Sequence, residues 1–290
     1  MVERNVDDIR GGLPVMLKAA LPAIPGVNLV PGVAKKGGDL PDLTLTRNDV
    51  AIDRAHVAAY ARVCGFERRE TIPLTYVHML AFPLHMALMT DRTFPYPAIG
   101  TVHLANSIHQ HRPIKPTERL TVSARADNLR PHPKGKVFDF VSTVTSDEDT
   151  VWESTSEYLR ISRSDPTAGA DVREPFDVVP SNGTEWKLPA NLGRRYAAVS
   201  GDHNPIHLYP LTAKALGFHR QIAHGMWSKA RCVAAFDTRL ADDVTVEVEF
   251  KKPIFLPGTV AFGSRVVAGG IDFSLTNPKN ASPHLVGRTR

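Results

Sequence analysis

The chain has 290 residues, of which 42% are hydrophobic and 22% charged, and its formal net charge is +5. This length suits two domains of ordinary size. The basic residues are dispersed along the whole chain, whereas a nucleic-acid-binding protein concentrates them on one face. The longest weakly polar stretch, residues 12–34, contains Lys18 and several prolines and lacks the run of about 20 apolar residues that spans a membrane. We therefore expect no nucleic-acid partner and no membrane span.

The two cysteines, Cys64 and Cys232, lie far apart in the sequence and have no metal-ligand spacing. Reduced, unpaired thiols are typical of proteins of the cytosol. We therefore predict a cytoplasmic protein without a disulfide, and we expect no cofactor and no metal.

The first predicted helix begins after Asp53, a favourable N-cap residue, and ends at the sequence Tyr60-Ala-Arg-Val-Cys-Gly65. A second, apolar helix is expected over 82–89. Pro83 should interrupt this helix, because a proline removes a backbone hydrogen bond from the helix interior. Strands are predicted where apolar and polar residues alternate with a period of two, at 120–126, 137–144 and 151–161.

Three histidines, His103, His109 and His111, alternate along a further predicted strand and should share one of its faces. Such a face could bind a metal ion, but a solvated or packed strand face is the more common arrangement.

Residues 163–175 lack apolar periodicity and are predicted to be a linker, and the sequence after them resembles the sequence before them. Tyr196-Ala-Ala-Val-Ser-Gly201 matches Tyr60–Gly65, and Lys252-Pro-Ile254 follows it as Arg112-Pro-Ile114 follows the first copy. Two matches in the same order indicate an internal duplication. The second half should therefore contain its own short helix, followed by a long helix over 226–240 and strands at 244–250 and 260–266. One long helix per half followed by antiparallel strands predicts an α+β architecture, with each helix wrapped by a curved sheet.

The segment after Gly201 reads Asp202-His-Asn-Pro-Ile-His207. Asp and His side chains are the most easily tuned for proton transfer near neutral pH, and the Asn-Pro step excludes regular helix here. A turn residue at Asp202 and a structural histidine at His207 are the alternatives when each is considered alone.

The full string Tyr-x-x-Val-Ser-Gly-Asp-x-Asn-Pro-Ile-His, followed by Ala223-His-Gly225, resembles the hydratase 2 motif of the MaoC-like (R)-specific enoyl-thioester hydratases and dehydratases. The resemblance is strongest over residues 190–265. It implies a double hot-dog fold, with a degenerate N-terminal repeat over 1–165 and a catalytic C-terminal repeat over 176–290. After Gly65 the first half has neither the Asp nor the His of the motif.

The resemblance implies that Asp202 and His207 activate a water, and that the backbone N–H of Gly225 polarises a thioester carbonyl at the N-terminus of the long helix. Asn204 would organise the loop or contact substrate. The substrate would be an (R)-3-hydroxyacyl or trans-2-enoyl thioester of coenzyme A or acyl-carrier protein, in fatty-acid metabolism. Several apolar residues of the first-half helix could line the acyl pocket or simply fill the core: Phe82, Leu84, Met86, Leu88 and Met89.

Several alternatives stay open at this point. A hot-dog acyl-CoA thioesterase would direct water at the carbonyl instead of C3, and a non-catalytic acyl-thioester-binding subunit would have no use for the Asp202/His207 pair. A metal site built from Asp202, His207 and His224 is conceivable, although a structural role suits His224 better. Lys251 and Lys252 could contact coenzyme A phosphates. Monomer and homodimer are both compatible with the sequence.

Overall fold

The computed structural model describes residues 2–6, 35, 37–98, 100–162 and 174–290. The weakly polar stretch 12–34 and the predicted linker up to residue 173 lie outside the described residues.

The repeated Tyr-Ala-x-Val-x-Gly sequence forms the C-terminal end of a short helix in both halves. Helix α2 (Arg54–Cys64) begins at Asp53, whose carboxylate accepts hydrogen bonds from the N–H groups of Ala55 and His56, as predicted. Gly65 ends it with φ 85°, and Gly201 ends helix α4 (Leu192–Ser200) in the same way with φ 73°. Glycine adopts this left-handed conformation without steric cost, which explains the last residue of the repeated motif.

The two long helices differ from their predicted lengths. Helix α3 (Val77–Thr90) begins five residues before the predicted start at Phe82 and continues through Pro83, so the predicted interruption is wrong. Its eleven buried residues provide enough tertiary packing to hold a helix that has lost one backbone hydrogen bond. Helix α6 (Gly225–Ala234) is shorter than the predicted 226–240, and a 3₁₀ turn, η4 (Asp237–Arg239), follows it.

The described strands form one 11-stranded sheet in the order β1-β2-β4-β5-β6-β3-β8-β11-β10-β9-β7. The first-half strands have these bounds: β1 (Val2–Asn5), β2 (Leu43–Ala51), β3 (Thr101–Gln110), β4 (Arg119–His132), β5 (Gly135–Ser146) and β6 (Asp149–Ile161). Those of the second half are β7 (Thr184–Leu188), β8 (Val244–Phe250), β9 (Gly258–Val267), β10 (Gly270–Thr276) and β11 (Pro283–Thr289). The strands predicted from alternation are therefore confirmed, most of them with longer bounds.

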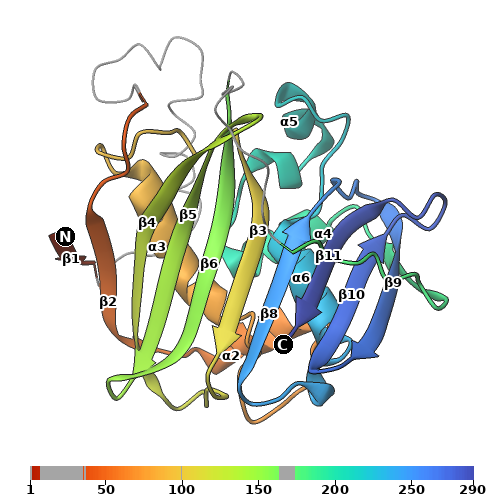
Figure 1. Ribbon diagram of the computed structural model, residues 1–290, viewed down its shortest axis with the longest axis horizontal. Helices are drawn as coiled ribbons and strands as arrows, with labels where there is room; N and C mark the ends of the chain where they lie inside the picture. The colour runs from red at the N-terminus through yellow and green to blue at the C-terminus, as the bar shows by residue number, and fades with distance from the viewer. Residues whose placement is uncertain (1, 7–34, 36, 99, 163–173) are drawn as a thin grey trace.

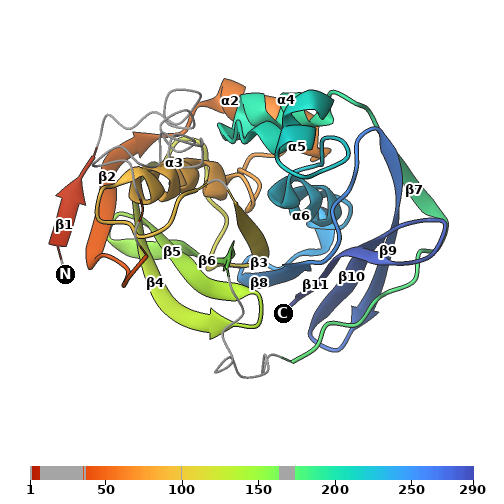
Figure 2. The ribbon, with the colours of Figure 1, turned by 90° about the horizontal axis from the view of Figure 1, so that it is seen from above.

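Apart from β1, which is an additional edge strand, the order of strands in the sheet is the same from both ends when the two halves are matched. The chain order strand, two helices and four strands occurs twice, as β2-α2-α3-β3-β4-β5-β6 and β7-α4-α6-β8-β9-β10-β11. In the second copy the 3₁₀ turn η3 and the short helix α5 (Pro210–Ala215) are inserted between α4 and α6. The two copies meet where β3 pairs antiparallel with β8, with Ala105 opposite Glu249 and Gln110 opposite Val244. Helix α3 lies in the concave face of the first half and α6 in that of the second, as Figures 1 and 2 show. The α+β prediction is confirmed.

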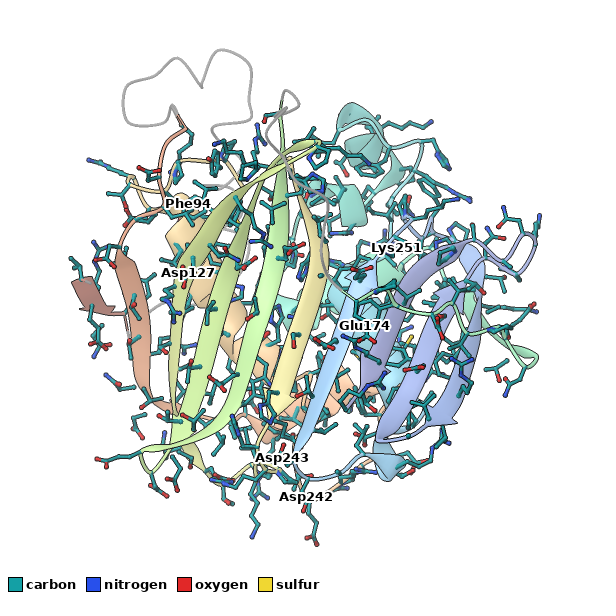
Figure 3. All side chains as sticks on the ribbon, viewed as in Figure 1. Phe94, Asp127, Glu174, Asp242, Asp243 and Lys251 are labelled. Atoms are coloured by element: carbon teal, nitrogen blue, oxygen red, sulfur yellow. The ribbon has the colours of Figure 1, made fainter. Side chains whose placement is uncertain are left out.

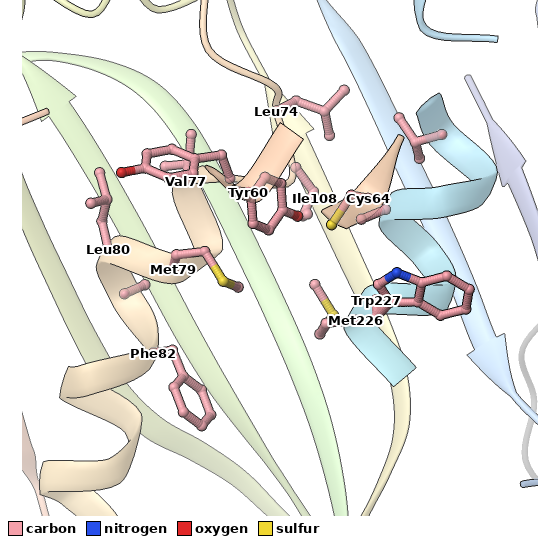
Figure 4. Close-up of a cluster of buried hydrophobic side chains, with 14 of the residues drawn as sticks. Tyr60, Cys64, Leu74, Val77, Met79, Leu80, Phe82, Ile108, Met226 and Trp227 are labelled. Carbon is pink, nitrogen blue, oxygen red and sulfur yellow. The ribbon is translucent and has the colours of Figure 1, made fainter. Parts of the chain in front are cut away.

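The interior between the two long helices belongs to both halves. Figure 4 shows Met79 and Phe82 of α3 facing Met226 of α6 across this interior. The indole N–H of Trp227, also on α6, donates to the carbonyl of Val63 on α2, 3.0 Å away. The outer face of the sheet, by contrast, carries many charged side chains (Figure 3). Among the described residues, no helix is both long and apolar enough to cross a membrane.

The three histidines of β3 do not share a face. The pairing of β3 with β6 shifts register between His103 and Ala105, so Leu104 is an extra, bulged residue. This bulge reverses the alternation, since it adds one residue between His103 and the remainder of the strand. His103 consequently stacks on the inward-facing Tyr158, with 4.4 Å between ring centroids, while His109 and His111 lie on the outer face beside Asp243 and Glu153.

Candidate active site

The segment that follows Gly201 folds into two successive side-chain-capped turns. The Asp202 carboxylate accepts the N–H of Asn204 at 3.0 Å, and the Asn204 side-chain oxygen accepts the N–H of Ile206 at 3.3 Å. Asn204 thereby caps the 3₁₀ turn η3 (Pro205–His207), and Pro205 suits the first position of a helical turn because it has no N–H to lose. These turns place Asp202 and His207 on a bent support, as predicted from the Asn-Pro step.

The imidazole of His207 is buried and fixed by the chain that precedes α6. Its Nδ1 lies 2.9 Å from the carbonyl oxygen of Ile222, so Nδ1 carries the proton and Nε2 can accept one. Burial lowers the pKa of His207 below its ordinary value, although the nearby Asp202 carboxylate opposes the shift. The backbone of His207 is also held by close packing, because a Cβ on Gly193 of α4 would lie 1.9 Å from the His207 carbonyl oxygen.

His224 connects Asp202 and His207. Its ring stacks on that of His207 with 3.7 Å between centroids, and its Nε2 donates to the backbone carbonyl of Asp202 at 3.0 Å. Burial, followed by the neighbouring His207 ring, lowers the pKa of His224 well below its ordinary value. The neutral His224 ring therefore holds the Asp202 backbone in place, which agrees with the structural role expected for it.

Gly225 is the first residue of α6, directly after His224. The first N–H groups of an α-helix have no partner within the helix, and the helix dipole favours negative charge there. A Cβ on Gly225 would lie 3.1 Å from the Phe250 ring, so the glycine lets this aromatic residue approach the helix start closely.

One cavity of about 560 Å³ contains the predicted site residues Asp202, Asn204, His207 and Gly225. The structure therefore brings together all four. The first half also lines this cavity, through Met79, Phe82, Met86 and Met89 of α3. Leu84 and Leu88 do not line the cavity and are fully buried, so for these two the core-filling alternative holds.

Lys251 and Lys252 also line the cavity, and both are exposed. Both lysines follow the C-terminal end of β8. Asp242 and Asp243 precede its N-terminal end, at the other end of the sheet (Figure 3). The Lys251 ammonium pairs with the carboxylate of Glu249. Glu249 therefore offsets the charge of Lys251, and Lys252 adds a second exposed ammonium group to the cavity lining.

Two groups of side chains have the spacing of possible metal ligands within the described residues. Atoms of Asp202, His207 and His224 lie within 4.8 Å of one another, as do atoms of His109, His111 and Glu153 on the outer face of the sheet. In the first group, Nδ1 of His207 and Nε2 of His224 already donate to backbone carbonyls, which directs both rings without an ion.

Sequence reasoning missed one cavity-lining histidine, His78 of α3, and placed another, His103 of β3, on the wrong face of its strand. A signal for His78 was present, because His78 and His85 are seven residues apart in an otherwise apolar helix and so lie on one face of it. No comparable signal existed for His103, because its inward position depends on the bulge at Leu104.

Comparison with known proteins identifies relatives along nearly the whole chain. A family model described as MaoC like domain matches residues 175–277. The 3-hydroxyacyl-thioester dehydratase X of Mycobacterium tuberculosis is 39% identical over 282 residues, which cover 96% of this chain and 98% of that protein.

Solved structures agree with this similarity. The crystal structure of HtdX of Mycobacterium tuberculosis superimposes with a TM-score of 0.75 at 38% identity, covering 85% of this chain and 99% of that one. A second protein of that organism, described as having a double hot-dog fold, matches with a TM-score of 0.52 at 13% identity over 88% of this chain and 94% of its own. The predicted double hot-dog fold is thus confirmed.

Proposed function

This chain belongs to the MaoC-like dehydratase family, and on that premise we propose that it interconverts trans-2-enoyl and (R)-3-hydroxyacyl thioesters by addition and removal of water. The observation that carries the proposal is the convergence of Asp202, His207 and the N-terminus of α6 in one cavity. The predicted family and the hydro-lyase activity agree with the dehydratase name of the relative with 39% identity.

The geometry supports a reaction in which Asp202 and His207 hold one water between them. A carboxylate oxygen of Asp202 and a ring nitrogen of His207 lie within 4.8 Å of each other, a separation that a single water can bridge. The neutral His207 accepts a proton from this water at Nε2 while the oxygen bonds to C3. The proton is then returned from the Asp202/His207 pair to C2, so one water supplies both added groups.

The first turn of α6 supplies the third requirement of the chemistry. Negative charge develops on the thioester oxygen as water adds to C3, and a fixed N–H donor lowers the energy of that transition state. Gly225 contributes this N–H, with the carbonyl directed at the helix start. Asn204 acts through the loop, since its side chain caps η3.

We extend the proposal to the carrier and the setting of the reaction. The exposed Lys251 and Lys252 suit the phosphates of a phosphopantetheine-bearing carrier, which coenzyme A and acyl-carrier protein share. The buried, unpaired thiols of Cys64 and Cys232 suit a reducing compartment, so we place the protein in the cytoplasm. A homodimer of the whole chain is compatible with this arrangement.

The test is an assay of the purified protein on trans-2-enoyl-CoAs of increasing chain length, with chiral analysis of the product. We expect loss of enoyl absorbance without release of thiol, and an (R)-3-hydroxyacyl product. Release of free thiol would instead indicate a thioesterase. Tight binding of crotonyl-CoA without hydration of any chain length would indicate a non-catalytic binding subunit.

A further inference from the structure

Two imidazoles that line the cavity have nitrogen atoms without a hydrogen-bond partner among the described residues. His78 is the second residue of the apolar helix α3 and is 1% exposed, and its Nδ1 has no hydrogen-bond partner among the described residues. His103 lies at the bulge of β3, and its Nε2 likewise has no partner there. Both rings line the same cavity as Asp202 and His207.

Each of these two cavity-lining rings is held in position by its neighbours. His103 is held between Tyr158 and Phe250, with ring centroids 4.4 and 4.9 Å away. His78 contacts His85 edge to face at 5.5 Å, and His85 is anchored by a 2.7 Å hydrogen bond between its Nε2 and the Ser142 hydroxyl. The neighbouring His78 ring contributes to the lowering of the pKa of His103, after burial.

Both imidazoles are neutral near pH 7. Burial lowers the pKa of His78 to about 3, and it lowers that of His103 well below the ordinary value. A neutral imidazole carries one N–H donor and one lone-pair acceptor. Two such rings together can therefore donate to and accept from the same small polar group, and neither attracts an anion.

Buried polar atoms without partners cost free energy, which a ligand recovers by pairing with them. An unsubstituted alkyl chain cannot do so, although it suits the neighbouring Met79, Phe82, Met86 and Met89. We propose that His78 and His103 form a subsite for a hydroxyl group on the acyl chain, beyond C3, so that the preferred substrates are hydroxylated acyl thioesters. A hydroxyl can donate to one ring nitrogen and accept from the other.

This inference rests on the proposed function for the identity of the chain as a thioester acyl group. It is tested with trans-2-enoyl-CoAs of constant length in which one hydroxyl is moved carbon by carbon from C4 to the terminal carbon. We expect kcat/KM to rise at least about tenfold over the unsubstituted chain at one or two adjacent positions and nowhere else, since a site built to bind a hydroxyl discriminates against its absence.

The variants His78→Phe and His103→Phe keep the aromatic packing and remove the ring nitrogens. Each should reduce the preference for the hydroxylated chain to about twofold or less, whereas Met86→Leu, an apolar exchange in the same cavity, should leave the preference unchanged. An equal or larger gain for a keto group at the same carbon would overturn the assignment of a hydroxyl, because a carbonyl can only accept. If His78→Phe does not fold, His103→Phe and the substrate series still decide the question.

Dissociation constants of the corresponding saturated acyl-CoAs separate this inference from the proposed function, because these molecules cannot be hydrated. Tighter binding of one hydroxylated isomer by the wild-type protein, lost in His103→Phe, supports the subsite even if no enoyl thioester is turned over. If the affinity and kcat/KM were the same for every hydroxyl position as for the unsubstituted chain, the inferred hydroxyl subsite would be overturned. The proposed hydratase activity on unsubstituted acyl chains would then still stand.

Discussion

The two halves of the chain share an element order but differ at the points where chemistry is expected. After the helix-ending Gly201, the second half places Asp202 in a side-chain-capped turn, whereas after Gly65 the first half places the buried Phe66, which packs on Tyr60. The same frame therefore supports a polar loop in one copy and apolar packing in the other.

The long helices show the same contrast. Helix α6 begins at Gly225 after His224, and α3 begins at Val77 after Tyr76, so only α6 opens with the glycine that permits close approach. Conversely, α3 supplies four apolar side chains to the cavity, in addition to His78. One half thus carries the proposed catalytic groups and the other shapes the room for the acyl chain, which shows that a single site can draw on both copies of a duplication.

The largest expected effect is the loss of either member of the proposed catalytic pair. Asp202→Asn keeps an oxygen that can accept the N–H of Asn204, so the loop should persist while the charge is lost. We expect Asp202→Asn and His207→Gln each to lower kcat by about 10³-fold or more, with little change in melting temperature. The exposed His219→Gln is the matched control. Near-normal turnover in either variant would contradict the assigned roles.

A smaller loss is expected when the start of α6 is altered. Gly225→Ala keeps the backbone N–H but places a methyl group 3.1 Å from the Phe250 ring, so the helix start or the ring must shift. We expect kcat to fall about 10–100-fold, since small displacements of positioning groups carry large kinetic costs. The double variant Gly225→Ala/Phe250→Leu, compared with Phe250→Leu alone, should recover part of the loss. If kcat did not recover in the double variant, contact with the Phe250 ring would not be the cause of the loss in Gly225→Ala.

Acid should destabilise the protein through its buried histidines, of which His78 and His85 lie on α3 in the first half. The pKa of His78 is about 3 in the folded protein because of burial, against about 6.5 in an unfolded chain. A depressed pKa contributes stability that is complete above the unfolded value and is lost as the pH falls through the folded value. We expect urea unfolding to show a declining free energy of unfolding between about pH 6.5 and 3, and His78→Phe to reduce that slope by up to about 1.4 kcal/mol per pH unit. Identical slopes would show that His78 binds its proton equally in both states.

The smallest effect is expected where the first half lacks the motif. Glu67 occupies the position of His203, two residues after the helix-ending glycine, and is exposed. Glu67→Gln should leave kcat/KM and the free energy of unfolding nearly unchanged, within about 0.5 kcal/mol. A loss comparable to that of Asp202→Asn would mean that the first-half loop also takes part in the reaction.

Much of this arrangement could be predicted from the sequence because it depends on local physical rules. The alternating run Val244–Phe250 is a strand with the predicted bounds, and the repeated Tyr-Ala-x-Val-x-Gly sequence is a helix C-terminus because glycine tolerates positive φ. The position of Asp202 and His207 on an irregular loop also followed from one Asn-Pro step.

Features that depend on distant parts of the chain could not be predicted in this way. Helix α3 extends through Pro83 because surrounding side chains bury it. The sequence of 77–90 alone does not specify that packing. The inward position of His103 depends on a bulge in the pairing of β3 with β6, and strand register is a property of two segments. Leu84 lies in the core and Met86 lines the cavity, and this difference depends on the tertiary contacts of α3.

The two copies are consecutive parts of one polypeptide and also pair with each other through the antiparallel junction of β3 and β8. In an assembly of two identical single repeats, any substitution after the helix-ending glycine would appear in both copies. Covalent fusion removes that constraint, because each copy accumulates its own substitutions. Phe66 in one half and Asp202 in the other are alternatives that a homodimer of repeats could not hold at the same time.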